Sequence, residues 1–215
     1  MGIDPESRNL QGLTTFLHLV ALNVLYLIAC LPLVTAGAAT AALYEVMLRY
    51  ADEERGYLIR GFLVGLRRNL LRGTMVLLAC GTPAAAAGFA AAFWLATGSA
   101  LGTAAGVVAV LFTVYFSGAL VHGLALAGRY DDAVGRVLRN ALLLPVAEPL
   151  RTGALLLRPV ATVSLWYVFP PAVVLLATIG FSVGAYLDAL ILHGVYRRRG
   201  GDPTALDPVS PHSGE

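Results

Sequence analysis

The feature that most constrains this chain is a long stretch without charge. Between Arg72 and Arg129 there is no Asp, Glu, Lys or Arg, so residues 73–128 form 56 consecutive uncharged positions. A water-soluble domain needs charge on its outward faces, whereas two bilayer-spanning helices joined by a short turn need about this length. The stretch therefore predicts a membrane-embedded helical hairpin that turns near Thr97-Gly98-Ser99. The mean hydropathy of +0.74 and the 13% of charged residues agree with a membrane protein.

Further apolar segments complete the predicted fold, an all-α polytopic membrane protein with five transmembrane helices. The segments lie at about 13–33, 73–97, 101–127, 152–169 and 171–195. The last two come from one apolar stretch that would measure roughly 66 Å as a single helix, against a hydrocarbon core of about 30 Å. This stretch must fold back, and Pro170-Pro171 is its natural break.

Arginine predicts the orientation of these spans. All 15 basic residues are Arg, and 13 of them lie in the three segments that five spans place on one side: 49–72, 129–151 and the tail after His193. The positive-inside rule then predicts an outside amino terminus and a carboxyl terminus in the cytoplasm, and hence a multi-pass protein of the inner (cytoplasmic) membrane. Residues 1–11 and 200–215 are polar and we expect them to be disordered, which leaves 12–199 as a single helical domain.

Two amphipathic segments precede spans on the predicted cytoplasmic side. In the first, apolar residues from Ile59 to Leu70 recur at helical spacing opposite Arg60, Arg67 and Arg68. The second occupies 134–142, with Arg136 and Arg139 beside its apolar stripe, and both predict helices at the membrane interface. Both segments contain a loose Val-Gly-x-x-Arg-Asn pattern, which indicates either a direct repeat or chance similarity between two basic helices.

The first span contains the most distinctive local sequence, from Asn23 to Tyr44. Pro32 removes a backbone hydrogen bond and Gly37 permits a turn, so we expect the helix to break here. Residues 38–50 would then lie at the cytoplasmic interface or re-enter shallowly. The break is either a binding or gating site or a packing kink, and its candidate site residues are Asn23, Pro32, Thr35, Gly37 and Thr40.

The same residues carry a resemblance to a known family. Asn23 followed by Leu31-Pro32-Leu-Val-Thr35-Ala-Gly37-Ala-Ala-Thr40-Ala-Ala-Leu-Tyr44 resembles the signature of the YesL family of bacterial integral membrane proteins, and weaker likeness extends the resemblance from about Gly12 to Arg199. The resemblance implies a small multi-spanning protein without an established activity, often encoded beside carbohydrate ABC importers. It supplies no catalytic residues.

A few ionisable groups lie within or near the spans. Arg158 and Asp188 fall inside consecutive antiparallel spans at similar depth, where an unpaired charge costs about 2.5–3.5 kcal/mol, so we predict that they pair. The pair forms either a gate or the wall of a polar cavity, or it is a structural ion pair; the further alternative is that Arg158 snorkels independently. Glu45 lies near the cytoplasmic interface and is a further candidate site residue. His122 and His193 lie near cytoplasmic helix ends, but no spacing predicts a metal site or another cofactor.

These features favour a non-enzymatic membrane accessory or regulatory protein, associated with carbohydrate uptake in the context that the resemblance implies. Its expected partners are the lipid bilayer, ABC importer subunits and a second copy of the chain, and not nucleic acid. The alternative is a small oligomeric transporter or channel with a pathway near the broken first helix and the Arg158/Asp188 pair. A membrane enzyme that uses Glu45, His122 or His193 ranks third.

Overall fold

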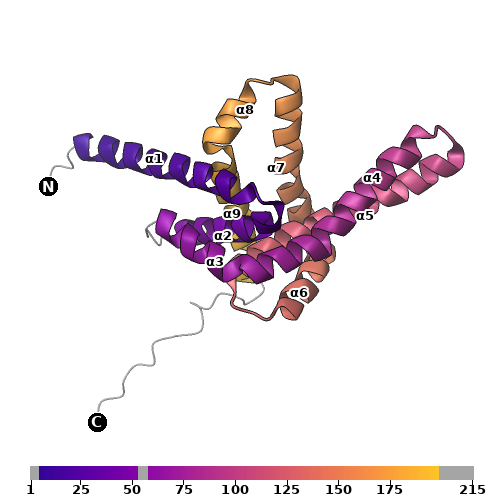
Figure 1. Cartoon of the computed structure of the whole chain (residues 1–215), viewed down its shortest axis with the longest axis horizontal. Helices are drawn as coiled ribbons and strands as arrows, with labels where there is room; N and C mark the ends of the chain where they lie inside the picture. Colours follow the sequence, from indigo (N-terminus) through magenta and orange to yellow (C-terminus); the bar gives the residue numbers. More distant parts are fainter. Residues whose placement is uncertain (1–4, 53–57, 199–215) are drawn as a thin grey trace, which may run out of the picture.

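The structure, a computed structural model, describes residues 5–52 and 58–198, with side chains over 14–52 and 58–192. These residues form helices joined by short turns and contain no strand (Figure 1). The helices are α1 (Pro5–Cys30), α2 (Leu33–Ala51), α3 (Leu58–Val76), α4 (Thr82–Ala96), α5 (Ala100–Arg129), α6 (Val134–Ala147), α7 (Pro149–Val168), α8 (Ala172–Leu175) and α9 (Phe181–Arg198). Two π-helical turns, η1 (Leu77–Gly81) and η2 (Leu176–Gly180), join α3 to α4 and α8 to α9.

The first helix begins at Pro5, earlier than the expected start at Gly12. Of the two ends expected to be disordered, residues 5–11 belong to this helix, and residues 1–4 and 200–215 lie outside the described part of the chain.

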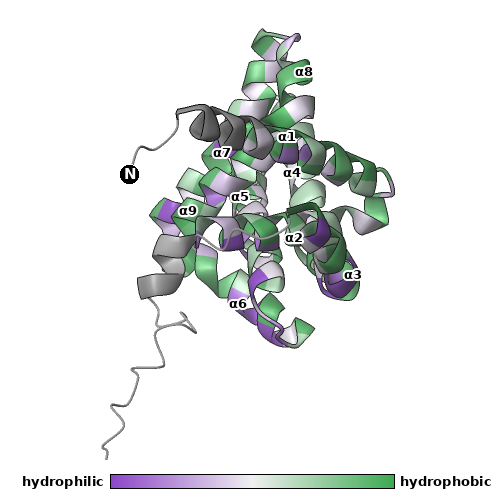
Figure 2. Cartoon of the chain, turned by 90° about the vertical axis from the view of Figure 1, so that its left-hand side faces the viewer, coloured by the Kyte–Doolittle hydropathy of each residue, from purple (hydrophilic) through white to green (hydrophobic). Residues whose placement is uncertain are grey.

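Among residues 5–52 and 58–198, three helical stretches are long and apolar enough to cross a membrane: Leu58–Ala96, Ala100–Arg129 and Ala172–Leu192. Figure 2 colours much of these stretches as hydrophobic, with hydrophilic residues on α3, and together they indicate a membrane protein. The remaining expected spans correspond to α1, whose apolar part Thr14–Cys30 is shorter, and to α7, which carries Arg158. The membrane crossing of these two helices, and with it the total of five spans, stays a prediction.

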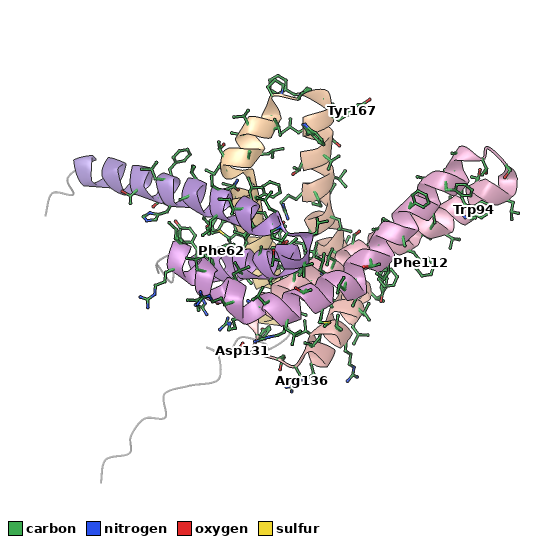
Figure 3. The ribbon with its side chains drawn as sticks, in the orientation of Figure 1. Phe62, Trp94, Phe112, Asp131, Arg136 and Tyr167 are labelled. Atoms are coloured by element: carbon green, nitrogen blue, oxygen red, sulfur yellow. The ribbon has the colours of Figure 1, made fainter. Side chains whose placement is uncertain are left out.

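Both predicted hairpin turns are present. Between α4 and α5, Gly98 has a φ of 64°, a left-handed conformation that glycine adopts at low cost, and the Ser99 hydroxyl accepts a hydrogen bond from the Gly102 N–H at 3.0 Å. Between α7 and α8 the chain reverses at Pro170-Pro171. The two hairpins diverge from a common foot, with Trp94 and Tyr167 near their tips and Asp131 and Arg136 at the foot (Figure 3).

The two amphipathic segments form helices as predicted. On α3, Phe62 is fully buried whereas Arg60 and Arg67 are exposed; on α6, Val137 is buried and Arg139 is exposed. The α3 helix continues through η1 into α4, so the amphipathic part and the apolar part form one helical stretch. In the second instance the chain breaks between α6 and α7, so the two units are joined differently and their relation as a repeat stays a prediction.

The helix break is confirmed at Leu31-Pro32. The position of residues 38–50 relative to the membrane stays a prediction. They belong to α2, the central helix of the fold, which contacts α1, α3, α5 and α9 and is buried over most of Gly37–Leu48. The physical reason for this burial is that Gly37–Leu48 is apolar or small at every position except Tyr44 and Glu45, whose polar groups have partners, so its faces can pack against neighbouring helices.

Candidate functional site

A buried polar cluster joins α2, α7 and α9, and it contains the pair predicted from the sequence. Arg158 donates a hydrogen bond from Nε to Oδ2 of Asp188 at 2.7 Å, and its Nη2 lies 2.6 Å from the same oxygen in an ion pair. The Tyr44 hydroxyl donates to that oxygen at 2.9 Å. Asp188 is 1% exposed and Tyr44 is 2% exposed, so the carboxylate is buried together with these two partners. The pairing of Arg158 with Asp188 is thus confirmed, and Tyr44 is a partner that the sequence analysis missed.

Glycine makes room for this cluster. A Cβ at Gly184 would lie 3.0 Å from both Cδ and Nη1 of Arg158, so a larger residue there would displace the guanidinium. Gly184 precedes Asp188 by four residues on α9, and this spacing places the two residues on the same side of the helix. The cluster has its charges matched internally, which makes it suited to fixing three helices in register.

Glu45 forms a second cluster, between α2 and α3. It is 4% exposed, and its Oε1 pairs with Arg68 at 2.7 Å and with Arg49 at 3.0 Å. Its Oε2 accepts from the side-chain amide of Asn69 at 3.1 Å. A Cβ at Gly65 would lie 2.8 Å from Oε2, so this glycine leaves room for the carboxylate. Glu45 is therefore buried and neutralised at a helix crossing.

The charge network continues from α3 to the loop between α5 and α6. Asp131 Oδ1 lies 2.6 Å from Arg72 Nη2, and Asp131 Oδ2 lies 3.4 Å from Arg68 Nη1. The hydrogen bond from Arg72 lowers the pKa of the Asp131 carboxyl below its usual range, and the Arg68 charge acts in the same direction. Arg68 thus touches both Glu45 and Asp131, so it links the central helix to the foot of the molecule shown in Figure 3.

Asn23 has a structural role that could not be read from the sequence. Its amide nitrogen donates to the backbone carbonyl of Ala177 at 2.6 Å and to that of Leu176 at 3.3 Å, within η2. Its amide oxygen accepts from the Ser182 N–H at 3.0 Å. The side chain therefore supplies hydrogen-bond partners to backbone groups in and beside the π-helical turn. Such a turn departs from the regular α-helical hydrogen-bond pattern, and within a membrane water cannot replace the missing partners. Asn23 fixes α1 against the junction of α8 and α9.

Among the remaining candidates of the first span, Thr35 and Thr40 are partly buried, whereas Pro32 is exposed at the helix break. Thr35 donates to the carbonyls of Ala29 and Pro32 at 2.6 and 2.8 Å, so it closes the helix break locally. Thr40 donates to the Ala36 carbonyl at 2.8 Å and lies 3.2 Å from the Tyr26 hydroxyl.

Gly37 does not turn the chain as expected, since it lies inside α2. A Cβ there would overlap the carbonyl oxygen of Gly73, so glycine is required for the close crossing of α2 and α3. The space beside Gly37 is therefore filled by protein, and the role of the break itself, a binding or gating site or a packing kink, stays a prediction.

One of the two histidines near the predicted cytoplasmic helix ends lies within the described side chains. His122 is buried, and its Nε2 lies 2.9 Å from the Thr152 hydroxyl, which itself donates to the Glu148 carbonyl. His193 lies outside the described side chains. Within the described ranges, no three His, Cys, Asp or Glu residues stand together as a metal site requires.

A cavity of about 430 Å³ lies beside the Arg158 end of the buried cluster, between α1, α7 and the segment from α8 to α9. Its lining is almost entirely apolar and includes Leu27, Pro159, Trp166 and Phe181.

Comparison with known proteins adds a family match over part of the chain. Residues 19–93 match the family described as "Protein of unknown function, DUF624". The match begins within α1 and ends within α4, so it includes Asn23, the helix break, α2 and the Glu45 cluster. It covers much less than the resemblance expected from Gly12 to Arg199. No curated protein and no solved structure matches the chain significantly.

Proposed function

We propose that this chain is a non-enzymatic, multi-pass protein of the inner membrane that acts as an accessory or regulatory partner of another membrane protein. The partner implied by the YesL resemblance is an ABC-type sugar importer. In this proposal all five apolar segments cross the bilayer, and the foot of the molecule, where Asp131 and Arg136 lie, faces the cytoplasm.

The observation that carries the proposal is the packing around α2. A transport pathway through the broken first helix would need a polar, open passage beside residues 32–40. Instead Gly37 meets Gly73 at backbone contact, and Ala38, Ala39 and the residues after Thr40 are buried among neighbouring helices. The two buried carboxylates, Glu45 and Asp188, are each matched by arginine. Such an interior favours a scaffold over a conduit.

A second candidate function is a small oligomeric transporter or channel whose pathway runs by Arg158 and Asp188. The cavity beside Arg158 is the observation that favours it. The apolar lining argues against passage of ions or sugars, because a desolvated polar solute would find almost no partners there.

Affinity purification from native membranes tests the accessory role. The chain, carrying a tag, is cross-linked in the membrane, solubilised in mild detergent and analysed by quantitative mass spectrometry. We expect importer subunits to be enriched with the wild type. A matched variant, Arg67→Glu, reverses one exposed charge on α3 and should reduce that enrichment while total expression stays the same. Recovery of the chain alone, with cross-links only to itself, would contradict the proposal.

Orientation is tested separately by labelling a single cysteine at Ser99, which lies in the α4–α5 turn. The variant keeps the rest of the chain but replaces Cys30 and Cys80 by alanine. A membrane-impermeant maleimide should label it from outside intact cells. Labelling that requires access from the cytoplasm would reverse the orientation.

A further inference from the structure

The cavity beside Arg158 has the dimensions of a ligand site. Its volume of about 430 Å³ falls within the range of roughly 300–1,000 Å³ that small-molecule pockets occupy. Walls come from three elements: Leu27 from α1, Val163 and Trp166 from α7, and Val173 and Phe181 from the segment opposite. The Arg158 guanidinium, at one end, is already bound to Asp188.

The chemistry of the walls limits what can fill this space. A water molecule needs two to four polar partners, and apolar cavities of this kind stay dry. A polar ligand would lose its hydration without recovering hydrogen bonds. The cavity is partly open, and one of its walls belongs to Ala172–Leu192, a stretch long and apolar enough to cross a membrane. The medium at the opening is therefore hydrocarbon, and a chain that enters gains dispersion contacts on three sides.

The length of the cavity matches the thickness of the hydrocarbon part of one leaflet, and one of its ends lies near aromatic residues typical of the headgroup level. On α7 its lining runs from Arg158 to Trp166, about 12 Å along the helix, close to half of the roughly 30 Å hydrocarbon core. Beyond Trp166, the side chains of Tyr167 and Phe169 are exposed at the hairpin tip, where Figure 3 shows Tyr167. Exposed aromatic side chains of this kind gather at the level of lipid headgroups.

We propose that this cavity is a binding site for one acyl chain of a membrane phospholipid, whose headgroup lies at the tip formed by Trp166, Tyr167 and Phe169. The chain follows α7 inward and its terminal methyl group ends near Pro159 and Arg158. An ordinary boundary lipid touches a single helical face. The chain in this site is enclosed by α1, α7 and α8–α9, so it stays with the protein when the surrounding bilayer is removed.

Native mass spectrometry of the full chain in mild detergent tests the proposal. The wild type should retain one phospholipid per molecule after exhaustive washing. Ala177→Phe fills the cavity from η2 and should lose that lipid, while its backbone carbonyl can still accept from Asn23. The matched control, Ala104→Phe, adds the same side chain on the exposed face of α5 and should retain the lipid. Retention by Ala177→Phe, equal loss from both variants, or a wild type that carries no lipid would overturn the proposal.

Photo-crosslinking on the unmodified chain keeps the test independent of the folding of any variant. The probe is a phosphatidylethanolamine that carries a diazirine near the end of one acyl chain, reconstituted with the protein in bilayers. Labels should concentrate on Pro159, Thr162 and Ala177, at the inner end of the cavity. Labelling of Leu111 and Phe112, which face outward from α5, to the same extent would show a boundary lipid only and refute the site.

Discussion

Replacing Asp188 by asparagine should destabilise the protein more than any change of a single exposed charge. The substitution keeps the size of the side chain but removes the charge that pairs with the Arg158 guanidinium and accepts hydrogen bonds from Arg158 Nε and Tyr44 Oη. Asp188 is 1% exposed and the Arg158 side chain only 28%, so the remaining guanidinium is left largely buried without its counter-ion. Removing one partner of a buried pair typically costs about 3–5 kcal/mol.

A double-mutant cycle separates the contributions of Arg158 and Asp188 to the free energy of unfolding from the interaction between them. Arg158→Leu and Asp188→Leu should each be strongly destabilising, whereas the double variant should recover part of the loss, because an apolar pair leaves no buried charge. Tyr44→Phe removes only one hydrogen bond and should cost about 1 kcal/mol. The matched control is Arg139→Leu, an exposed arginine for which the described residues offer no acidic partner, and it should change little.

The assay is reversible unfolding in mixed micelles, followed by helical circular dichroism, with thermal melting as a second readout. The coupling energy between residues 158 and 188 is the quantity of interest. Losses that simply add in the double variant would mean that the two side chains do not stabilise each other, and the account of the buried cluster would fail.

Three further predictions concern the other packed positions. Gly37→Leu should severely destabilise the fold or prevent its accumulation, because the close helix crossing has no space for a side chain, whereas Gly135→Leu, at an open position on α6, should be tolerated in the same thermal melts. Asn23→Leu should cost about 1–3 kcal/mol and speed amide hydrogen exchange in η2, and unchanged exchange there would disprove the bridge. Asp131 has a folded pKa below its unfolded value, so its contribution to stability is present above the unfolded pKa of about 3.9 and is lost as the pH falls through the folded pKa. The difference in melting temperature between the wild type and Asp131→Asn should therefore vanish on acidification, be small throughout because Asp131 is exposed, and shrink in the Arg72→Leu background, where the longer contact with Arg68 remains.

The elements that follow from local chain chemistry were predicted from the sequence. Pro32 ends α1 and Pro170-Pro171 separates α7 from α8, because proline lacks the N–H and the freedom that a helix needs. The Arg158–Asp188 pair was predicted because an unpaired charge at that depth is costly. Each of these inferences needs only the spacing along the chain and the presence of a bilayer.

The features that depend on which distant residues meet in the fold were not predicted. The central position of α2 was missed, although Gly37–Leu48 is apolar or small at almost every position, which is a signal of burial. The role of Asn23 depends on a π-helical turn more than 150 residues away in the chain, which no local pattern announces. The partner of Tyr44 could not be predicted, because the sequence does not show which side of α2 faces Asp188 on α9.

The central claim is that the interior around α2 is a packed scaffold and not a conduit. The most direct measurement is solute flux in liposomes that contain only the purified wild-type chain, with sugars and monovalent ions as test solutes. The account predicts flux no greater than in empty liposomes, and the same result for Arg158→Leu/Asp188→Leu. Saturable flux in the wild type that is abolished in that double variant, while its helical content is preserved, would contradict the claim.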